Sequence, residues 1–151
     1  MNKVASAVQA YLKSQDWRFS FDEDRNVFDF KMAAKNCDSI RVLIIAKETS
    51  ICTYAILPIK VPEEQRVAAA EFEARANFGL NIGNMELDMT DGEVRYKSSL
   101  CCSEDSIPSM RVIERSVDLA FMMLDRYAKG LLRLVYGGMS TEEAVELAEK
   151  N

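Results

Sequence analysis

The sequence contains no histidine among its 151 residues. Histidine is the side chain that changes charge near neutral pH, and it provides the base of Ser-His-Asp and Cys-His catalytic sites as well as many metal ligands. Its absence excludes those catalytic arrangements and every histidine-based metal site. Catalysis by lysine or by carboxylate side chains stays open.

Other ligand-binding patterns are also missing. The sequence has neither of the glycine-rich phosphate motifs, GxxxxGK[ST] and GxGxxG, and its four cysteines lack the CxxC spacing of zinc sites. Asp22, Asp24 and Asn26 match the first half of a calcium-binding loop. Val27 and Ala33, however, stand where that loop requires glycine and glutamate. We therefore expect no cofactor and no bound metal.

The charge balance disfavours two classes of partner. Acidic residues number 24 against 19 basic ones, which gives a formal net charge of -5. Such a surface repels phosphate backbones and anionic lipids, so we expect binding to neither nucleic acid nor membrane. Residues 1–17 contain no long apolar run and resemble neither a signal peptide nor a membrane span. Cysteines without paired spacing then favour the reducing cytoplasm.

Hydrophobic periodicity predicts one α+β domain over residues 1–151. In chain order we expect a helix at 2–16, antiparallel strands at 17–21, 28–32, 40–46 and 51–57, a helix at 62–78, a hairpin of strands 85–89 and 94–97, a long helix around 113–135 and a short helix from 140. The apolar run 40–46 predicts a central strand covered on both faces. Pro58 should end the strand before it, and Asp91-Gly92 predicts a two-residue hairpin turn.

The helix at 62–78 is apolar on two opposite sides. One side carries Val67, Ala70, Ala74 and Phe78, and the other carries Ala69, Phe72 and Ala76. A helix that covers a single core needs one apolar face. The pattern therefore leaves two possibilities, a homodimer or a chain that covers both faces itself. For the homodimer, we assign Ala69, Phe72 and Ala76 to the contact.

Two residue clusters suggest alternative functions. Glu86, Asp88, Asp91 and Glu93 crowd the predicted hairpin, and paired carboxylates can bind magnesium or hydrolyse glycosides. A small enzyme using these hairpin carboxylates is one alternative, although alternation with apolar residues is typical of the wet face of a sheet. Cys101 and Cys102 form a vicinal pair. A thiol-based redox sensor is the second alternative, and ordinary half-buried cysteines would explain the pair equally.

Three segments carry a family resemblance: YLKSQDWRFSFDEDRNVFDF, EARANFGLNIGNMELDMTDGEVRYKSSL and LDRYAKGLLRLVYGGMSTEEA. Together with the order of elements, they resemble the YbjN family of bacterial sensory transduction regulators. That family is similar in fold to type III secretion chaperones, which are small acidic homodimers that hold a segment of a secreted protein in extended form. The resemblance implies a chaperone-like fold that dimerises through the second helix and the following hairpin. It brings no catalytic residues.

These observations lead to one leading hypothesis. We expect a non-enzymatic, cytoplasmic, chaperone-like or regulatory module that forms a homodimer and binds another protein or an extended peptide segment. The candidate groove residues for that segment are Val4, Val8, Leu12, Trp17 and Phe19.

Overall fold

The computed structural model describes residues 1–103 and 105–150. Over these residues the chain forms four α-helices, one short 3-10 helix and six strands. The elements are α1 (Lys3–Ser14), β1 (Ser20–Asp22), β2 (Val27–Ala33), β3 (Ser39–Lys47), β4 (Ser50–Lys60), η1 (Glu63–Gln65), α2 (Arg66–Asn77), β5 (Asn84–Leu87), β6 (Glu93–Cys101), α3 (Met110–Gly137) and α4 (Thr141–Glu149). The predicted α+β class and the order of elements are confirmed.

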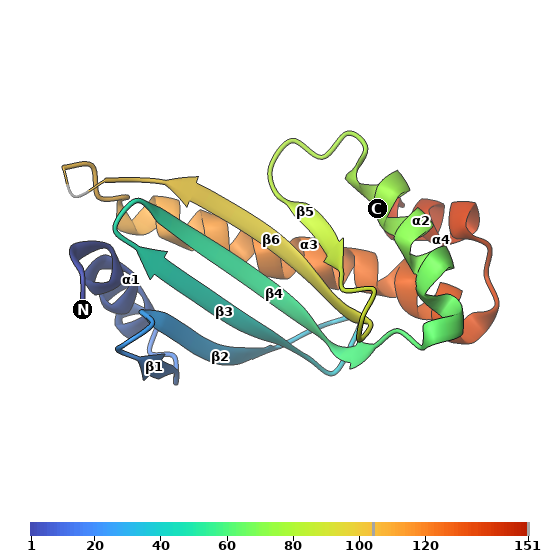
Figure 1. Ribbon diagram of the computed structural model, residues 1–151, viewed down its shortest axis with the longest axis horizontal. Helices are drawn as coiled ribbons and strands as arrows, with labels where there is room; N and C mark the ends of the chain where they lie inside the picture. The colour runs from blue at the N-terminus through green and yellow to red at the C-terminus, as the bar shows by residue number, and fades with distance from the viewer. Residues whose placement is uncertain (104, 151) are drawn as a thin grey trace.

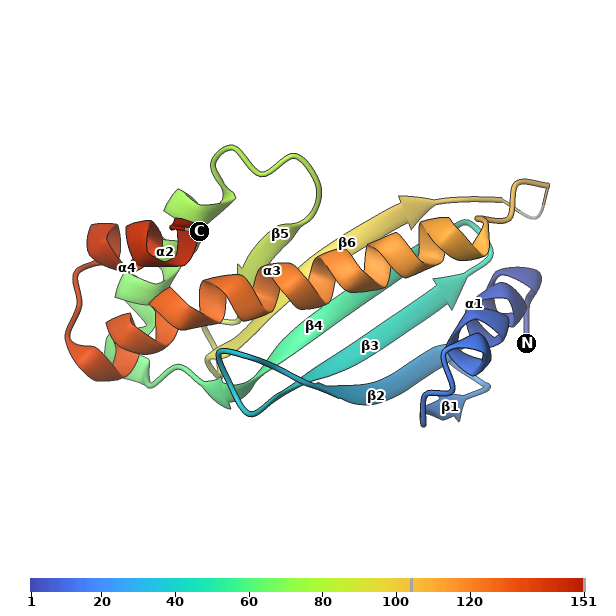
Figure 2. The ribbon, with the colours of Figure 1, turned by 180° about the vertical axis from the view of Figure 1, so that it is seen from behind.

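The six strands form one antiparallel sheet in the order β1-β2-β3-β4-β6-β5. The long helix α3 crosses one face of this sheet (Figure 2), and α1 packs beside it against β3. Figure 1 shows that α1 lies at one end of the elongated molecule, whereas α2 and α4 lie at the other.

One face of β3 is open, which corrects the expectation of a strand covered on both faces. Val42 and Ile44 are fully buried beneath the helices, while Leu43 and Ile45, which point the other way, are half-buried. Among the described residues, no helix crosses that second face (Figure 1). Leu43 and Ile45 lie between the neighbouring strands β2 and β4 on this face. An apolar run in the sequence does not show whether a helix covers such residues.

An aromatic cluster closes the end of the molecule that holds α1. The ring of Trp17 lies 5.9 Å from that of Tyr11 and 5.4 Å from that of Phe30. Phe19 and Phe21 both pack on Phe28, at 5.7 and 4.4 Å between ring centroids. Strand pairing starts only at Ser20, three residues later than predicted.

The end of β4 and the turn between β5 and β6 also differ from the sequence-based expectation. β4 continues through Pro58 to Lys60, because its pairing with β6 shifts between Ile56 and Lys60. Such an irregularity tolerates a residue without an N–H. The hairpin between β5 and β6 has the five-residue connection 88–92, which Asp88 closes by donating its N–H to the carbonyl of Glu93 at 2.9 Å.

Close contact between α3 and α4 depends on Gly130. A Cβ at this position would lie 2.1 Å from the carbonyl oxygen of Ala144, so only glycine allows the two helices to approach this closely. α4 in turn packs against α2. Gly130 therefore helps to set where α2 sits at its end of the molecule.

Candidate functional site

Helix α2 is tied to the β5–β6 hairpin at both of its ends. At its carboxyl end, the Asn77 side chain accepts the N–H of Met85 at 2.7 Å and donates to the carbonyl of the same residue at 3.1 Å. At its amino end, the Arg66 guanidinium donates to the carbonyls of Met89 and Thr90, each at 3.2 Å. The helix and the hairpin therefore form one structural unit.

The two apolar sides of α2 have opposite surroundings. Ala69, Phe72 and Ala76 are 0%, 0% and 1% exposed, whereas Val67 is 75% exposed and Phe78 is 91% exposed. This corrects the assignment of Ala69, Phe72 and Ala76 to a dimer contact: they are buried in the core of the single chain and no second copy can reach them. Dimerisation itself stays a prediction.

The exposed side of α2 is here called the outer face of α2, and it consists of Val67, Ala70, Ala74 and Phe78. Two further exposed apolar residues lie near its ends, Met89 in the hairpin loop and Ile82 in the loop that follows the helix. Of the nine large hydrophobic residues exposed in the described part of the chain, four lie on or beside this face. Exposed apolar residues are thus concentrated here, as is typical of an interaction surface.

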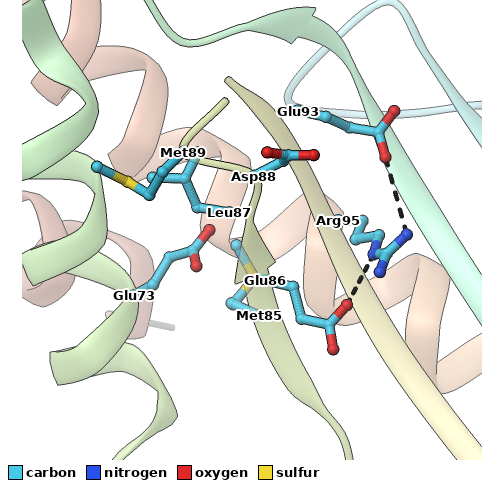
Figure 3. Close-up of a pocket in the computed structure, with 8 residues that line it drawn as sticks. All are labelled: Glu73, Met85, Glu86, Leu87, Asp88, Met89, Glu93 and Arg95. Carbon is cyan, nitrogen blue, oxygen red and sulfur yellow. Dashed lines mark hydrogen bonds and ion pairs between the residues drawn. The ribbon is translucent and has the colours of Figure 1, made fainter. Parts of the chain in front are cut away.

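A pocket of about 600 Å³ lies between α2 and the hairpin (Figure 3). Its lining residues come from α2, β5, the hairpin loop and β6: Glu73, Met85, Glu86, Leu87, Asp88, Met89, Glu93 and Arg95. Four carboxyl groups therefore surround this space together with one guanidinium. The pocket is acidic, with an apolar wall of two methionines and a leucine.

Glu73 is the unusual member of the pocket. Its side chain projects from α2 toward Met85 and Leu87 (Figure 3), and the residue is 6% exposed. Oε1 of Glu73 is buried and has no hydrogen-bond partner. Burial, together with repulsion from Glu86, raises the pKa of Glu73 to about 8. An unsatisfied buried polar group costs about 1–3 kcal/mol, so this position is unfavourable for the folded chain alone.

The pKa of the neighbouring Glu86 is shifted in the opposite direction to that of Glu73. Burial would raise its pKa, but hydrogen bonds from Lys97 and Arg95 outweigh it and lower the pKa of Glu86. The Arg95 bond is 2.7 Å long. Glu86 is therefore held as an ionised partner of two basic side chains, which leaves it unsuited to proton transfer near neutral pH.

The predicted hairpin carboxylates are only partly brought together. Glu86, Asp88 and Glu93 line the pocket, whereas Asp91 is paired with Lys60 on the neighbouring strand. Among the described residues, no group of three or more cysteine and carboxylate side chains is arranged to hold a metal ion. The pocket therefore combines the carboxyl groups of Glu73, Asp88 and Glu93 with Glu86, which Arg95 and Lys97 hold by hydrogen bonds.

Sequence reasoning missed Glu73 because this polar residue belongs to neither apolar side of the predicted helix. A signal was present, however. Ala69 and Ala76, four residues before and three after, flank Glu73 on the surface of the helix, and both belong to the buried face. A carboxylate between two buried alanines at these spacings is a candidate for burial.

The predicted groove residues separate into two groups. Val4, Val8 and Leu12 are fully buried on the inner side of α1, so their assignment to a partner groove is corrected. Phe19 is partly buried against Phe28. Trp17 lies at the surface of a pocket of about 400 Å³ and shares it with Lys31, Met32 and Phe121 among others.

The vicinal cysteines lie where β6 ends. Cys101 is exposed and Cys102 is partly buried, and all four cysteines are free thiols. Burial, reinforced by the neighbouring Cys101, raises the pKa of Cys102. A raised pKa lowers the fraction of reactive thiolate, so the surroundings of Cys102 do not activate it.

Within residues 1–103 and 105–150, none of the helices combines the length and the apolar character needed to cross a lipid bilayer.

Comparison with known proteins identifies the family. Residues 5–133 match the YbjN family, whose description is "Putative bacterial sensory transduction regulator". The fold is similar to the crystal structure of YbjN from E. coli, described as "a putative transcription regulator", with a TM-score of 0.54 and 15% identity over 80% of this chain and 90% of that chain. None of the curated proteins is significantly similar in sequence. The match over most of its length places this chain in the YbjN family.

Proposed function

We propose that this chain is a non-enzymatic, cytoplasmic regulatory module that acts by binding protein, as a homodimer held together by the outer face of α2. The observation that carries the proposal is the exposure of Val67 at 75% on α2 and of Phe78 at 91% directly after its last residue. Fully burying a large apolar side chain contributes about 1.5–3 kcal/mol, which these residues do not gain within one chain. The description of the family as a regulator agrees with a binding role.

The outer face of α2 fits a second copy of itself. Val67 and Phe78 are eleven positions apart in the sequence, which is about 16 Å along a helix. If two copies of α2 pack antiparallel about a two-fold axis near residues 72–73, Val67 of each copy meets Phe78 of the other. Ala70 and Ala74 then lie close to the axis, where small side chains allow the helices to approach.

Charge complementarity supports the same arrangement. Glu71 and Arg75 are both exposed and form an ion pair of 2.8 Å along α2. In the antiparallel arrangement, Glu71 of one copy lies opposite Arg75 of the second copy, and the reverse pair forms by symmetry. Such rim charges fix the orientation of an interface more than its affinity.

The surface near Trp17 supports binding of an extended segment. β1 pairs only with Val27–Asp29 of β2, so the part of β2 that follows has no strand partner on its outer side. The pocket that Trp17 shares with Lys31 and Met32 lies beside this unpaired stretch. A partner strand could add there and place a side chain in the pocket. The edge of β5 is less accessible, because Asn77 occupies both backbone groups of Met85.

Light scattering coupled to size-exclusion chromatography tests the dimer. We expect the wild-type chain to have twice the mass of the monomer and Phe78→Glu to have the monomer mass. Met122→Glu is the matched control, because Met122 is 64% exposed on α3 and lies outside the outer face of α2. A monomeric wild type, or equal loss of the dimer in both variants, would contradict the proposal.

A further inference from the structure

We infer that the pocket between α2 and the β5–β6 hairpin binds an organic cation, namely a primary ammonium or guanidinium group on a short apolar stem. None of the four residues of the outer face of α2 lines this pocket, although Met89 lies beside both, so the inference does not depend on dimerisation. Three observations carry it: an unpartnered buried acceptor, an excess of carboxyl groups and an apolar wall.

The unpartnered acceptor is Oε1 of Glu73. The residue is 94% buried, lines the pocket and is directed toward Met85 and Leu87 (Figure 3). Buried polar atoms are normally hydrogen-bonded, and an exception calls for a physical explanation. Oε1 is closed to solvent in this conformation, so a ligand in the pocket would satisfy it by donating to the Glu73 carboxyl after a small rotation of the side chain.

The rest of the lining determines the charge of that ligand. Glu86 is already neutralised by Arg95 and Lys97, whereas Asp88 and Glu93 add negative charge on the hairpin side. The carboxylate of Glu93 lies 3.9 Å from the guanidinium of Arg95, so this ion pair is weaker than the pair between Glu86 and Arg95. An anionic ligand would be repelled, and a cation would be attracted.

The chemistry of the lining favours an organic cation over a metal ion. Metal ions require several oxygen, nitrogen or sulfur ligands around one point, and the described residues provide no such group here. Met85, Leu87 and Met89 instead form an apolar wall. An ammonium or guanidinium group donates hydrogen bonds without accepting any, and an alkyl stem would cover the methionines.

Binding should be coupled to loss of a proton from Glu73. Its pKa is raised to about 8 by burial and by Glu86. The charged groups that line the pocket beside Glu73 are Glu86 on β5, Asp88 in the hairpin loop, and Glu93 and Arg95 on β6. Two other helices also pack near α2. Tyr127 of α3 packs on Phe72, and Glu142 of α4 pairs with Arg75. Of the two protonation states of Glu73, only the ionised one adds a negative charge to those of Asp88 and Glu93, and it is this state that we expect to hold the cation. The affinity for the cation should therefore be about tenfold higher at about pH 9 than at about pH 7, because the ammonium group of the ligand is charged at both pH values.

Methyl NMR of the methionines tests the site in the full chain. The probes are n-butylamine and its neutral analogue n-butanol, added to protein with ¹³C-labelled methionine methyl groups. We expect n-butylamine to shift Met85 and Met89 in a saturable way and n-butanol to leave them unchanged. Met110, which is 50% exposed and outside the pocket, should respond to neither probe. Equal shifts with both probes, or none with the amine, would overturn the inference.

Two variants localise the binding. Glu73→Gln should abolish the amine-induced shifts, and Glu64→Gln, which is exposed just before the same helix and outside the pocket, should leave them intact. If Glu73→Gln does not fold, Asp88→Asn provides the second test, with an expected several-fold loss of affinity. Unchanged affinity in the folded Glu73→Gln protein, or otherwise in Asp88→Asn, would overturn the inference.

A peptide arm distinguishes a free amine from a protein side chain as the natural source of the cation. An uncharged-backbone tripeptide, acetyl-Gly-Lys-Gly-amide, is titrated under the same conditions. Affinity at least tenfold above that of n-butylamine indicates a lysine presented by a protein, and similar or lower affinity indicates a free amine. Either result supports the site, because both require Glu73. Loss of the dimer in light scattering would leave these shifts unchanged, so the two proposals fail independently.

Discussion

The two ends of the molecule are built in opposite ways. At the α1 end, Val4 and Leu12 are fully buried and Trp17 closes an aromatic cluster. At the α2 end, Phe78 is on the outside and Glu73 is on the inside. The large apolar side chains of α1 are therefore buried within one chain. Those of the outer face of α2 are not, and this is the face that we propose a second copy covers.

The largest expected effect separates the two sides of α2. Phe72→Ala should lower the free energy of unfolding by about 3–5 kcal/mol, because Phe72 is fully buried and packs edge-on against Tyr127. Phe78→Ala should change it by no more than about 0.5 kcal/mol when measured at protein concentrations that keep the chain monomeric. Denaturant unfolding of both variants checks this. Similar losses would mean that the two ends do not differ as described.

The second prediction concerns pH and the buried carboxyl. Glu73 has a pKa raised to about 8, so between the ordinary glutamate pKa and that value the folded chain keeps a proton that the unfolded chain has released. Stability should therefore fall as pH rises through this window and level off above it, by up to about 5 kcal/mol in total. Glu73→Gln should remove most of this decline, as measured by denaturant unfolding across the pH range. A decline of the same size in the variant would contradict the burial of Glu73.

A smaller effect tests how α2 is held on the hairpin. Asn77→Ala removes two hydrogen bonds to Met85 and should cost about 1–3 kcal/mol. The amide of Met85 should also exchange faster with deuterium. Asn81→Ala, in the exposed loop that follows the helix, is the matched control and should be close to neutral. Faster exchange in both variants would show that the loop, and not Asn77, fixes this contact.

The smallest effect is expected on the open face of the sheet near the α1 end. The guanidinium of Arg41 and the carboxylate of Asp29 pair at 2.6 Å, and their side chains are 49% and 31% exposed. Pairs at this exposure typically contribute about 0.2–1 kcal/mol. Arg41→Gln should lie in that range in thermal unfolding. A larger loss would mean that surface charges, besides the aromatic cluster, stabilise this end.

The sequence predicted the order of elements well, because the alternation in β2, the apolar run of β3 and the helical patterns of α1 and α3 are strong. It also identified both apolar sides of α2. Periodicity shows that a side is apolar, but it does not show what covers it. Hence periodicity assigns Ala69 and Phe72 to a homodimer contact, although they are buried in the core of one chain. It does not show that Phe78, on the other apolar side, is the exposed residue.

The candidate site was harder to predict than the fold. The crowding of Glu86, Asp88 and Glu93 on the hairpin is visible in the sequence, but the pairing of Glu86 with Arg95 and Lys97 depends on strand register. Glu73 comes to this pocket from another element, through the packing of α2 on β5. Sequence patterns describe each element separately, so a pocket formed between two elements is not visible in either.

Disulfide cross-linking across the outer face of α2 tests the central claim most directly. In a background with all four cysteines replaced by serine, Ala74→Cys places a thiol near the expected two-fold axis, and Met122→Cys places one on the exposed surface of α3. Under mild oxidation, the account predicts that Ala74→Cys is converted to a covalent dimer while Met122→Cys stays largely monomeric. Equal, slow conversion of both variants would contradict it.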